Sequence, residues 1–266
     1  MRVRVVQHRD RRRAALRRRV VWGGGELLVT AGVLVLLLVV HQLWWTNREA
    51  RAGAERKVRA LEREWGNGAS GAGSGSGAGR GSATAGAASE GGSGGAEGGR
   101  QGAGAGGRRA SGASPRVSQA YAVVVIPRLG LRAPVAEGTG KRDVLNKGYV
   151  GHYRGTQQPG QAGNFALAGH RNTHGEPFRY LNRLRVRDVV RIETASAVYT
   201  YTVGEILPRT SARDFGVLRP VPRSVVRPSY GYTRPGHYLT LTTCTPEYTS
   251  RYRLVVWGTL TSTHPR

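Results

Sequence analysis

The chain of 266 residues contains a single cysteine, Cys244, and this scarcity excludes an internal disulfide. Acidic residues are also few, because 16 Asp and Glu stand against 41 Lys and Arg, and the formal net charge is +25. Only one uncharged apolar run approaches 19 residues. The sequence therefore predicts one membrane span at most, together with a strongly basic surface.

The basic excess raises the question of a nucleic-acid partner, but its distribution argues against one. Nine arginines and one acidic residue lie in residues 1–21, whereas the 22 basic and eight acidic residues of 115–266 are scattered. No helix-turn-helix, zinc-finger or RNA-binding signature is present. We therefore expect no nucleic-acid partner, and attraction to anionic membrane and wall polymers instead.

The apolar run Leu27–Trp45 is 19 residues long and has no charged residue. At ~1.5 Å per helical residue it reaches roughly 28 Å, close to the thickness of a hydrocarbon core. A cleaved signal peptide is the alternative, but the run is long for one, and bulky residues replace the small-residue cleavage site. Residues 22–45 are thus predicted to be an uncleaved anchor. The Arg-rich residues 1–21 predict a cytoplasmic tail, with the rest of the chain outside.

The next two segments differ sharply in composition. Residues 46–65 mix charges at helical spacing and predict a juxtamembrane helix. Val58, Leu61 and Trp65 form a thin apolar stripe on it that permits weak contacts, although a solvated stalk is the favoured interpretation. Residues 66–114 hold 20 of the 40 glycines and no aromatic residue, Val, Ile or Leu. They cannot bury enough apolar surface to offset chain entropy, so a disordered linker is predicted.

Residues 115–266 form a segment long enough to build one core. Short strand-like runs separated by Pro and Gly predict an all-β sandwich or barrel. Helical signals are short, at Arg142–Asn146 and Phe178–Leu184. The predicted strands are Tyr121–Pro127, Asn164–Ala168, Val189–Thr194, Val198–Leu207, Tyr238–Thr243 and Arg253–Thr261.

The cysteine ends one of these runs, in TLTTCTP. His170 lies 74 residues before Cys244 and Arg253 lies nine residues after it, and together they make a set suited to covalent catalysis. A buried structural thiol is the alternative, and spacing alone does not choose between them. His174 beside His170 raises the possibility of zinc, but a third and a fourth ligand are not evident, so no metal is expected.

The segments LAGHR, TLTTCTP and RLVVWG resemble, in this order, the catalytic segments of sortases, the cysteine transpeptidases of Gram-positive cell surfaces. A T-x-G-x-P-F tail follows LAGHR, formed by Thr173, Gly175, Pro177 and Phe178. The resemblance covers roughly residues 121–260. It implies a sortase-type closed β-barrel with short helices, and transfer of a sorted protein onto an amine without a cofactor.

The resemblance also implies a role for each residue of the catalytic set. Cys244 would be the nucleophile and His170 the general acid and base. Arg253 would position the substrate and stabilise the oxyanion. Arg251 would face the same side of an alternating strand, so periodicity does not choose between the two arginines. The resemblance favours Arg253, which opens the RLVVWG strand.

Within the family, the chain is most like the class E sortases of actinobacteria, since no second span and no aromatic lid segment are evident. That class implies recognition of an LAXTG signal, to which Tyr153 is tied by position. Thr242 and Thr243 are further candidates for substrate binding, with ordinary strand threonines as the alternative. The expected partners are LAXTG-type proteins and an amine of lipid II or peptidoglycan. A class C-like pilin polymerase and a non-catalytic wall-binding module remain as alternative functions.

Overall fold

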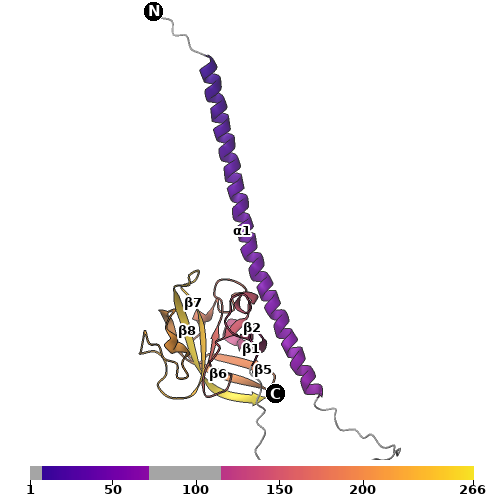
Figure 1. Ribbon diagram of the computed structural model, residues 1–266, viewed down its shortest axis with the longest axis vertical. Coiled ribbons are helices and arrows are strands. Elements are labelled where there is room, and N and C mark those ends of the chain that lie inside the picture. The colour runs from indigo at the N-terminus through magenta and orange to yellow at the C-terminus, as the bar shows by residue number, and fades with distance from the viewer. Residues whose placement is uncertain (1–7, 72–114) are drawn as a thin grey trace, which may run out of the picture.

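The computed structural model describes residues 8–71 and 115–266, which form one long helix and one β-barrel. The helix, α1, spans His8–Gly71 and passes along the side of the barrel where β1 and β2 lie (Figure 1). The barrel also carries four short 3-10 turns, which are η1 (Pro127–Leu129), η2 (Leu145–Lys147), η3 (Leu181–Arg183) and η4 (Phe215–Leu218).

The strands close in the order β1-β2-β3-β4-β7-β8-β6-β5. Two of the neighbouring pairs, β2 with β3 and β4 with β7, are parallel, and the others are antiparallel. The prediction of an all-β closed barrel is therefore confirmed. The strands are β1 (Ala120–Ile126), β2 (Leu131–Glu137), β3 (Val150–His152), β4 (Gly163–Ala168), β5 (Val189–Thr194), β6 (Ala197–Ser211), β7 (His237–Thr245) and β8 (Tyr252–Pro265).

The first strand shows how the core is arranged. Ala122, Val124 and Ile126 point into the barrel, as alternation along a strand requires. Val123 and Val125 point outward but are also buried, because α1 covers this face. Burial on both faces explains why the strand is an unbroken apolar run rather than an alternating one.

The sequence prediction missed two strands, β2 and β3. Pro134 is one of the prolines expected to separate strands, yet it lies inside β2 and opposite Val123 of β1. The short strand β3 begins to pair with β2 only at Val135, so β2 has a free edge at the proline, where a strand tolerates one. The expected helices at 142–146 and 178–184 are only the 3-10 turns η2 and η3.

The structure corrects the expectation of a solvated stalk. A single helix continues from the predicted tail through the anchor and reaches Gly71, six residues into the predicted linker. Ala50, Ala54, Val58 and Leu61 of this helix are all buried, at spacings of three and four residues. The predicted apolar stripe therefore packs on the barrel of its own chain. The remainder of the predicted linker, 72–114, lies outside the described residues.

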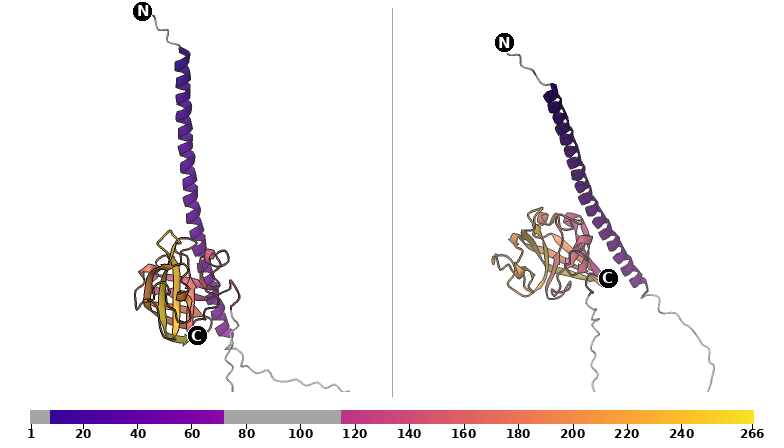
Figure 2. Two further views of the ribbon diagram at one scale, coloured as in Figure 1. Left: turned by 60° about the vertical axis from the view of Figure 1, so that its left-hand side comes forward. Right: turned by 45° about the horizontal axis from the view of Figure 1, so that its top comes forward.

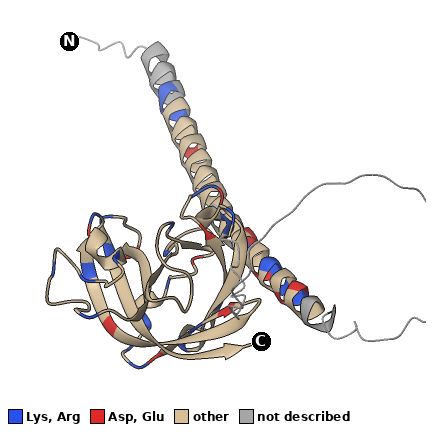
Figure 3. Cartoon of the chain, turned by 60° about the horizontal axis from the view of Figure 1, so that its bottom comes forward, with Lys and Arg blue, Asp and Glu red and all other residues tan. Residues whose placement is uncertain are grey.

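The apolar part of α1 behaves differently from the part that contacts the barrel. It extends away from the barrel in both further views (Figure 2) and forms a long stretch without charge (Figure 3). Among the side chains that the structure describes, the large apolar ones from Leu27 to Val40 are exposed, and so are Trp44 and Trp45. Among the described helices it alone is long and apolar enough to cross a membrane.

Candidate active site

A cleft of about 900 Å³ lies between the barrel and α1, and it brings the three predicted catalytic residues together. Cys244 comes from the end of β7, His170 from the segment after β4, and Arg253 from the start of β8. Helix α1 forms part of the wall. The other lining residues are Gln42, Trp44, Thr46, Asn47, Lys141, Arg171, Asn172, Thr173, His174, Glu176, Tyr248, Thr249 and Ser250.

Cys244 and Arg253 are held together by strand pairing. They lie directly opposite each other in the antiparallel ladder of β7 and β8. Opposite residues share a face of the sheet, with Cβ atoms about 4.5–5.5 Å apart. The Arg253 Nη1 donates to the carbonyls of Ser250 (2.8 Å) and Tyr252 (3.0 Å). These bonds fix one end of the guanidinium and leave its Nε and Nη2 without a hydrogen-bond partner in the described ranges.

The neighbouring arginine is placed quite differently. Arg251 precedes β8, is exposed, and stacks over the ring of Tyr252 at 5.2 Å. It does not line the cleft, whereas Arg253 does. Of the two arginines that strand alternation did not distinguish, Arg253 is thus the one that lies within β8 and lines the cleft.

His170 follows β4 and is held by side chains from two neighbouring segments. Its Nε2 lies 2.9 Å from Oδ1 of Asn146, so this nitrogen donates and Nδ1 keeps its lone pair. The ring also stacks on His174, with centroids 5.4 Å apart. Burial, and then the charges of His174 and Lys141, lower the pKa of His170 to about 4. The imidazole is therefore neutral at pH 7 and is able to accept a proton.

This lowered pKa predicts a direction for stability. An unfolded histidine titrates near 6.5, so between about pH 6.5 and 4 the unfolded chain binds a proton that the folded chain does not. The contribution of His170 to the free energy of unfolding is therefore complete above pH 6.5. It is lost as the pH falls toward 4.

Replacing His174 tests the second cause of this shift. In His174→Asn we expect the pKa of His170 to rise part of the way back toward 6.5, because one like charge is removed while burial remains. NMR titration of the imidazole signals measures the change. His237→Asn is the matched control, since His237 is exposed at the opposite end of β7. A His170 that titrates near 6.5 in the unaltered protein would contradict the assignment.

Sequence reasoning missed two residues that order the site. Arg171 is buried, and its Nη1 donates to the Cys244 carbonyl (3.2 Å) and to Oγ1 of Thr245 (2.9 Å). It adjoins His170 in the LAGHR segment, so that motif was its only signal. Asn146 had no signal in the sequence, because it reaches His170 from η2, 24 residues earlier in the chain.

The three predicted substrate-binding residues do not line the cleft. Tyr153 and Thr242 lie next to each other, with their hydroxyls 3.1 Å apart. Thr242 also donates to the Leu167 carbonyl (3.2 Å), and Thr243 donates to that of Gly169 (2.8 Å). Both threonines are buried, and close to Cys244 they connect β7 to β4 (Thr242) and to the residue after β4 (Thr243). Their hydroxyls therefore order the strand end that presents the thiol.

The loop behind His170 has an unfavourable backbone. His174, Gly175 and Glu176 follow one another with φ of 52°, 84° and 52°. Non-glycine residues in this region cost about 1–3 kcal/mol each and persist only where the surroundings impose them. Four buried polar atoms between Arg171 and Arg179 also have no hydrogen-bond partner within the described segments. The loop therefore depends on outside contacts for its shape.

The described residues include no cluster of three or more His, Cys, Asp or Glu side chains that could hold a metal ion. The stacked pair His170 and His174 faces a cleft with one cysteine, and the remaining lining is mostly amide, hydroxyl and basic. This arrangement suits proton transfer and nucleophilic attack by a thiol.

Comparison with known proteins identifies a family model and several relatives that resemble this chain. The family model described as "Sortase domain" matches residues 124–261. Sortase SrtE1 of Streptomyces coelicolor is 39% identical over 231 residues, which cover 85% of this chain and 53% of that protein. Sortase SrtE2 of the same organism is 40% identical over 134 residues, 48% of this chain and 51% of that protein. The chain thus spans about half the length of these sequence relatives.

Solved structures match the barrel in particular. The crystal structure of Sortase E1 from Streptomyces coelicolor, solved with a tripeptide in its active site, is 47% identical with a TM-score of 0.53. The match covers 56% of this chain and 92% of that one. Sortase F of Corynebacterium diphtheriae is 27% identical with a TM-score of 0.52, over 58% and 90% of the two chains. The likeness thus covers little more than half of this chain, but nearly all of either solved one.

Proposed function

The chain belongs to the sortase family, and from this premise we propose that it is a membrane-anchored cysteine transpeptidase with its catalytic domain in residues 115–266. The enzyme cleaves an LAXTG-like sorting signal after its threonine. It then transfers the acyl group to an amine of a peptidoglycan precursor such as lipid II. The observation that carries the proposal is the convergence of Cys244, His170 and Arg253 on one cleft.

A peptide substrate is supported by the relative whose structure holds a tripeptide in its active site, since the barrels are 47% identical. An LAXTG signal, rather than LPXTG, is supported by the similarity to class E relatives and by Tyr153. That tyrosine touches Thr242, which shares a strand face with Cys244 two residues further on. Tyr153 would thus affect which sorting signal is recognised, by helping to set the position of β7 beside Cys244.

The first half of the reaction breaks the peptide bond. Neutral His170 accepts the thiol proton as Cys244 Sγ attacks the threonyl carbonyl carbon. The carbonyl oxygen gains negative charge, which the free donors of Arg253 stabilise. The carbon–nitrogen bond then breaks, and His170 gives its proton to the departing amine. A thioester between the substrate threonine and Cys244 results, and the imidazole is neutral again.

The second half transfers the acyl group. The acceptor amine attacks the thioester carbon while His170 takes a proton from the amine. The carbon–sulfur bond breaks, a new amide forms, and the proton returns to the sulfur of Cys244. Because the thioester retains the acyl group, no external energy source is needed. In both steps, Arg253 stabilises the negative charge that develops on the carbonyl oxygen.

Intact-mass spectrometry tests the proposal directly. The protein is mixed with an LAXTG or an LPXTG peptide, with and without an added amine. We expect a thioester adduct on Cys244 with the LAXTG peptide, and an amide product only when the amine is present. Absence of an adduct with both peptides would contradict the transpeptidase activity. A preference for LPXTG would contradict the class E specificity alone.

The two arginines near Cys244 give a matched pair of variants. In Arg253→Ala we expect turnover of the LAXTG peptide to fall by about 10²-fold, the loss typical of one oxyanion donor. Arg253→Lys should recover little, since lysine keeps the charge but lacks the planar fork. Arg251→Ala should leave turnover of the LAXTG peptide nearly unchanged, because Arg251 is exposed and outside the cleft. Loss in Arg251→Ala with activity retained in Arg253→Ala would reverse the assignment.

We propose that α1 anchors the enzyme with its N-terminus in the cytoplasm. Support comes from the uncharged stretch of α1 and the arginines before it. The barrel then lies outside the cell, where sorting signals and peptidoglycan precursors meet. Protease added to intact protoplasts is expected to release the barrel. A barrel that stays protected while the N-terminus is cut would show the reverse orientation.

A further inference from the structure

We propose that α1 is part of the catalytic unit as well as the anchor, because Asn47 and Arg51 hold the loop behind His170 in its active shape. This inference rests on the proposed function. The loop runs from Arg171 to Arg179 and is called the histidine loop below. Asn47 and Arg51 lie two and six residues beyond Trp45, which is about 3 and 9 Å further along the helix axis. They are positioning residues, since they act through the loop.

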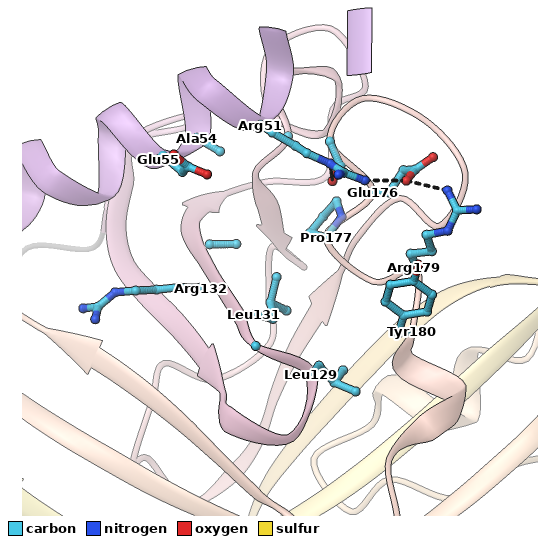
Figure 4. Close-up of a pocket in the computed structure, with 14 residues that line it drawn as sticks. Arg51, Ala54, Glu55, Leu129, Leu131, Arg132, Glu176, Pro177, Arg179 and Tyr180 are labelled. Carbon is cyan, nitrogen blue, oxygen red and sulfur yellow. Dashed lines mark hydrogen bonds and ion pairs between the residues drawn. The ribbon is translucent and has the colours of Figure 1, made fainter. Parts of the chain in front are cut away.

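Three contacts join α1 to the tip of the histidine loop. The Gly175 N–H donates to Oδ1 of Asn47 at 2.6 Å. Arg51 Nε donates to the Gly175 carbonyl at 3.1 Å, and Arg51 Nη2 donates to Oε2 of Glu176 at 2.7 Å. Figure 4 shows the Arg51 side chain extending from α1 to Glu176. One turn of α1 thus binds the N–H and C=O of Gly175 and the side chain of Glu176.

These contacts fall on the strained part of the loop. Gly175 and Glu176 are two of the three consecutive residues with positive φ, and the third, His174, stacks on His170. A backbone with these φ angles persists only where surrounding contacts hold it in place. The Gly175 N–H and C=O have no hydrogen-bond partner within the loop, and their partners are Asn47 and Arg51 of α1. The helix therefore fixes the position of the ring against which His170 rests.

The same turn of α1 also supports Asn146, the other partner of His170. Gly148, just after η2, is so close to the helix that an added Cβ would lie 2.8 Å from the Ala50 carbonyl oxygen. The same Cβ would lie 3.3 Å from the His174 carbonyl oxygen. The η2 segment is thus enclosed between α1 and the histidine loop, so the helix backs both groups that contact the catalytic imidazole.

Glu176 connects this arrangement to the opposite wall of the cleft. Its buried carboxylate also accepts from Arg179 Nη1 at 2.7 Å, on the side away from Arg51 (Figure 4). Arg179 in turn pairs with Glu247 at 3.2 Å, in the segment between Cys244 and Arg253. Burial raises the pKa of Glu176, but the hydrogen bonds from Arg179 and Asn47 and the two arginine charges outweigh burial and lower it. The carboxylate therefore stays charged at neutral pH and holds both arginines.

The test uses the full-length protein in phospholipid nanodiscs and the variants Arg51→Ala, Asn47→Ala and their combination. We expect kcat for the LAXTG peptide to fall by ~10-fold in each single variant and by up to ~10²-fold in the double, since small misplacements of catalytic groups have such costs. KM should change little in Arg51→Ala, because Arg51 does not line the cleft. Arg51→Lys keeps the ion pair and should recover part of kcat.

Hydrogen exchange supplies a readout that is independent of turnover. Amides of the histidine loop should exchange faster in both single variants, because the Gly175 N–H loses its acceptor or its neighbouring support. The barrel strands should exchange as before, and the unfolding midpoint of the barrel should shift by less than about 2 °C. An equal loss of protection throughout the barrel would indicate general destabilisation and overturn the proposal.

Arg59→Ala is the matched control. Arg59 also lies on α1 and pairs with one carboxylate, but that partner is Glu55 of the same helix. We expect wild-type kcat and wild-type exchange from it. Unchanged kcat and exchange in Arg51→Ala and Asn47→Ala would refute the positioning role. If the unaltered protein and Arg59→Ala both lack turnover, the proposed function fails, while the exchange measurement still decides whether α1 holds the loop.

Discussion

Cys244→Ala is expected to form no acyl-enzyme with an LAXTG peptide, and its turnover should fall to the uncatalysed background. The reason is that the chain has no other cysteine, so no thiol is available to replace the nucleophile. Intact-mass spectrometry detects the thioester, and peptide cleavage followed by chromatography measures turnover. This is the largest effect that we expect from a single substitution.

The substitution should leave the barrel folded, which keeps the result interpretable. Cys244 is only partly buried, and the neighbouring contact of Arg171 uses the backbone carbonyl of Cys244, which alanine retains. Circular dichroism and the unfolding midpoint should therefore match those of the unaltered protein. Full activity in a folded Cys244→Ala protein would refute the cysteine transpeptidase mechanism itself.

His170→Ala is expected to lower turnover by about 10²–10⁴-fold, the range that positioned proton transfer typically contributes. Both steps need the imidazole, which protonates the departing amine and later deprotonates the incoming one. Single-turnover measurements with and without an added amine should therefore show slower acylation and slower transfer. A residual rate is expected, because Cys244 and Arg253 remain in the cleft.

His237→Ala is the control for this variant, since His237 is exposed and distant from the cleft along β7. It should retain wild-type turnover. Combining Cys244→Ala with His170→Ala should be no worse than Cys244→Ala alone, because groups that act as a unit are not additive. Turnover in His170→Ala equal to that of the control would remove His170 from the mechanism.

The three residues that we propose as the catalytic set could be picked out from the sequence, for a reason that is local. Cys244, His170 and Arg253 each lie in a short segment whose residues resemble those of a known family, and each segment ends or opens a strand. Alternation and Pro–Gly punctuation likewise predicted most of the strands. The exceptions were β2 and β3, where a proline inside a strand and a run of only three residues weakened the pattern.

The sequence by itself, with its family resemblance, thus determined the β-barrel, the uncharged helix and the three residues that we propose as the catalytic set. The tertiary structure decided what surrounds them. Asn146 reaches His170 from a 3-10 turn, and Asn47 and Arg51 reach the histidine loop across more than 120 residues. Such contacts carry no periodicity, because each depends on the closure of the barrel and on the docking of α1. The stripe of Val58 and Leu61 was visible in the sequence, but its partner, the outer face of β1, existed only once the chain had folded.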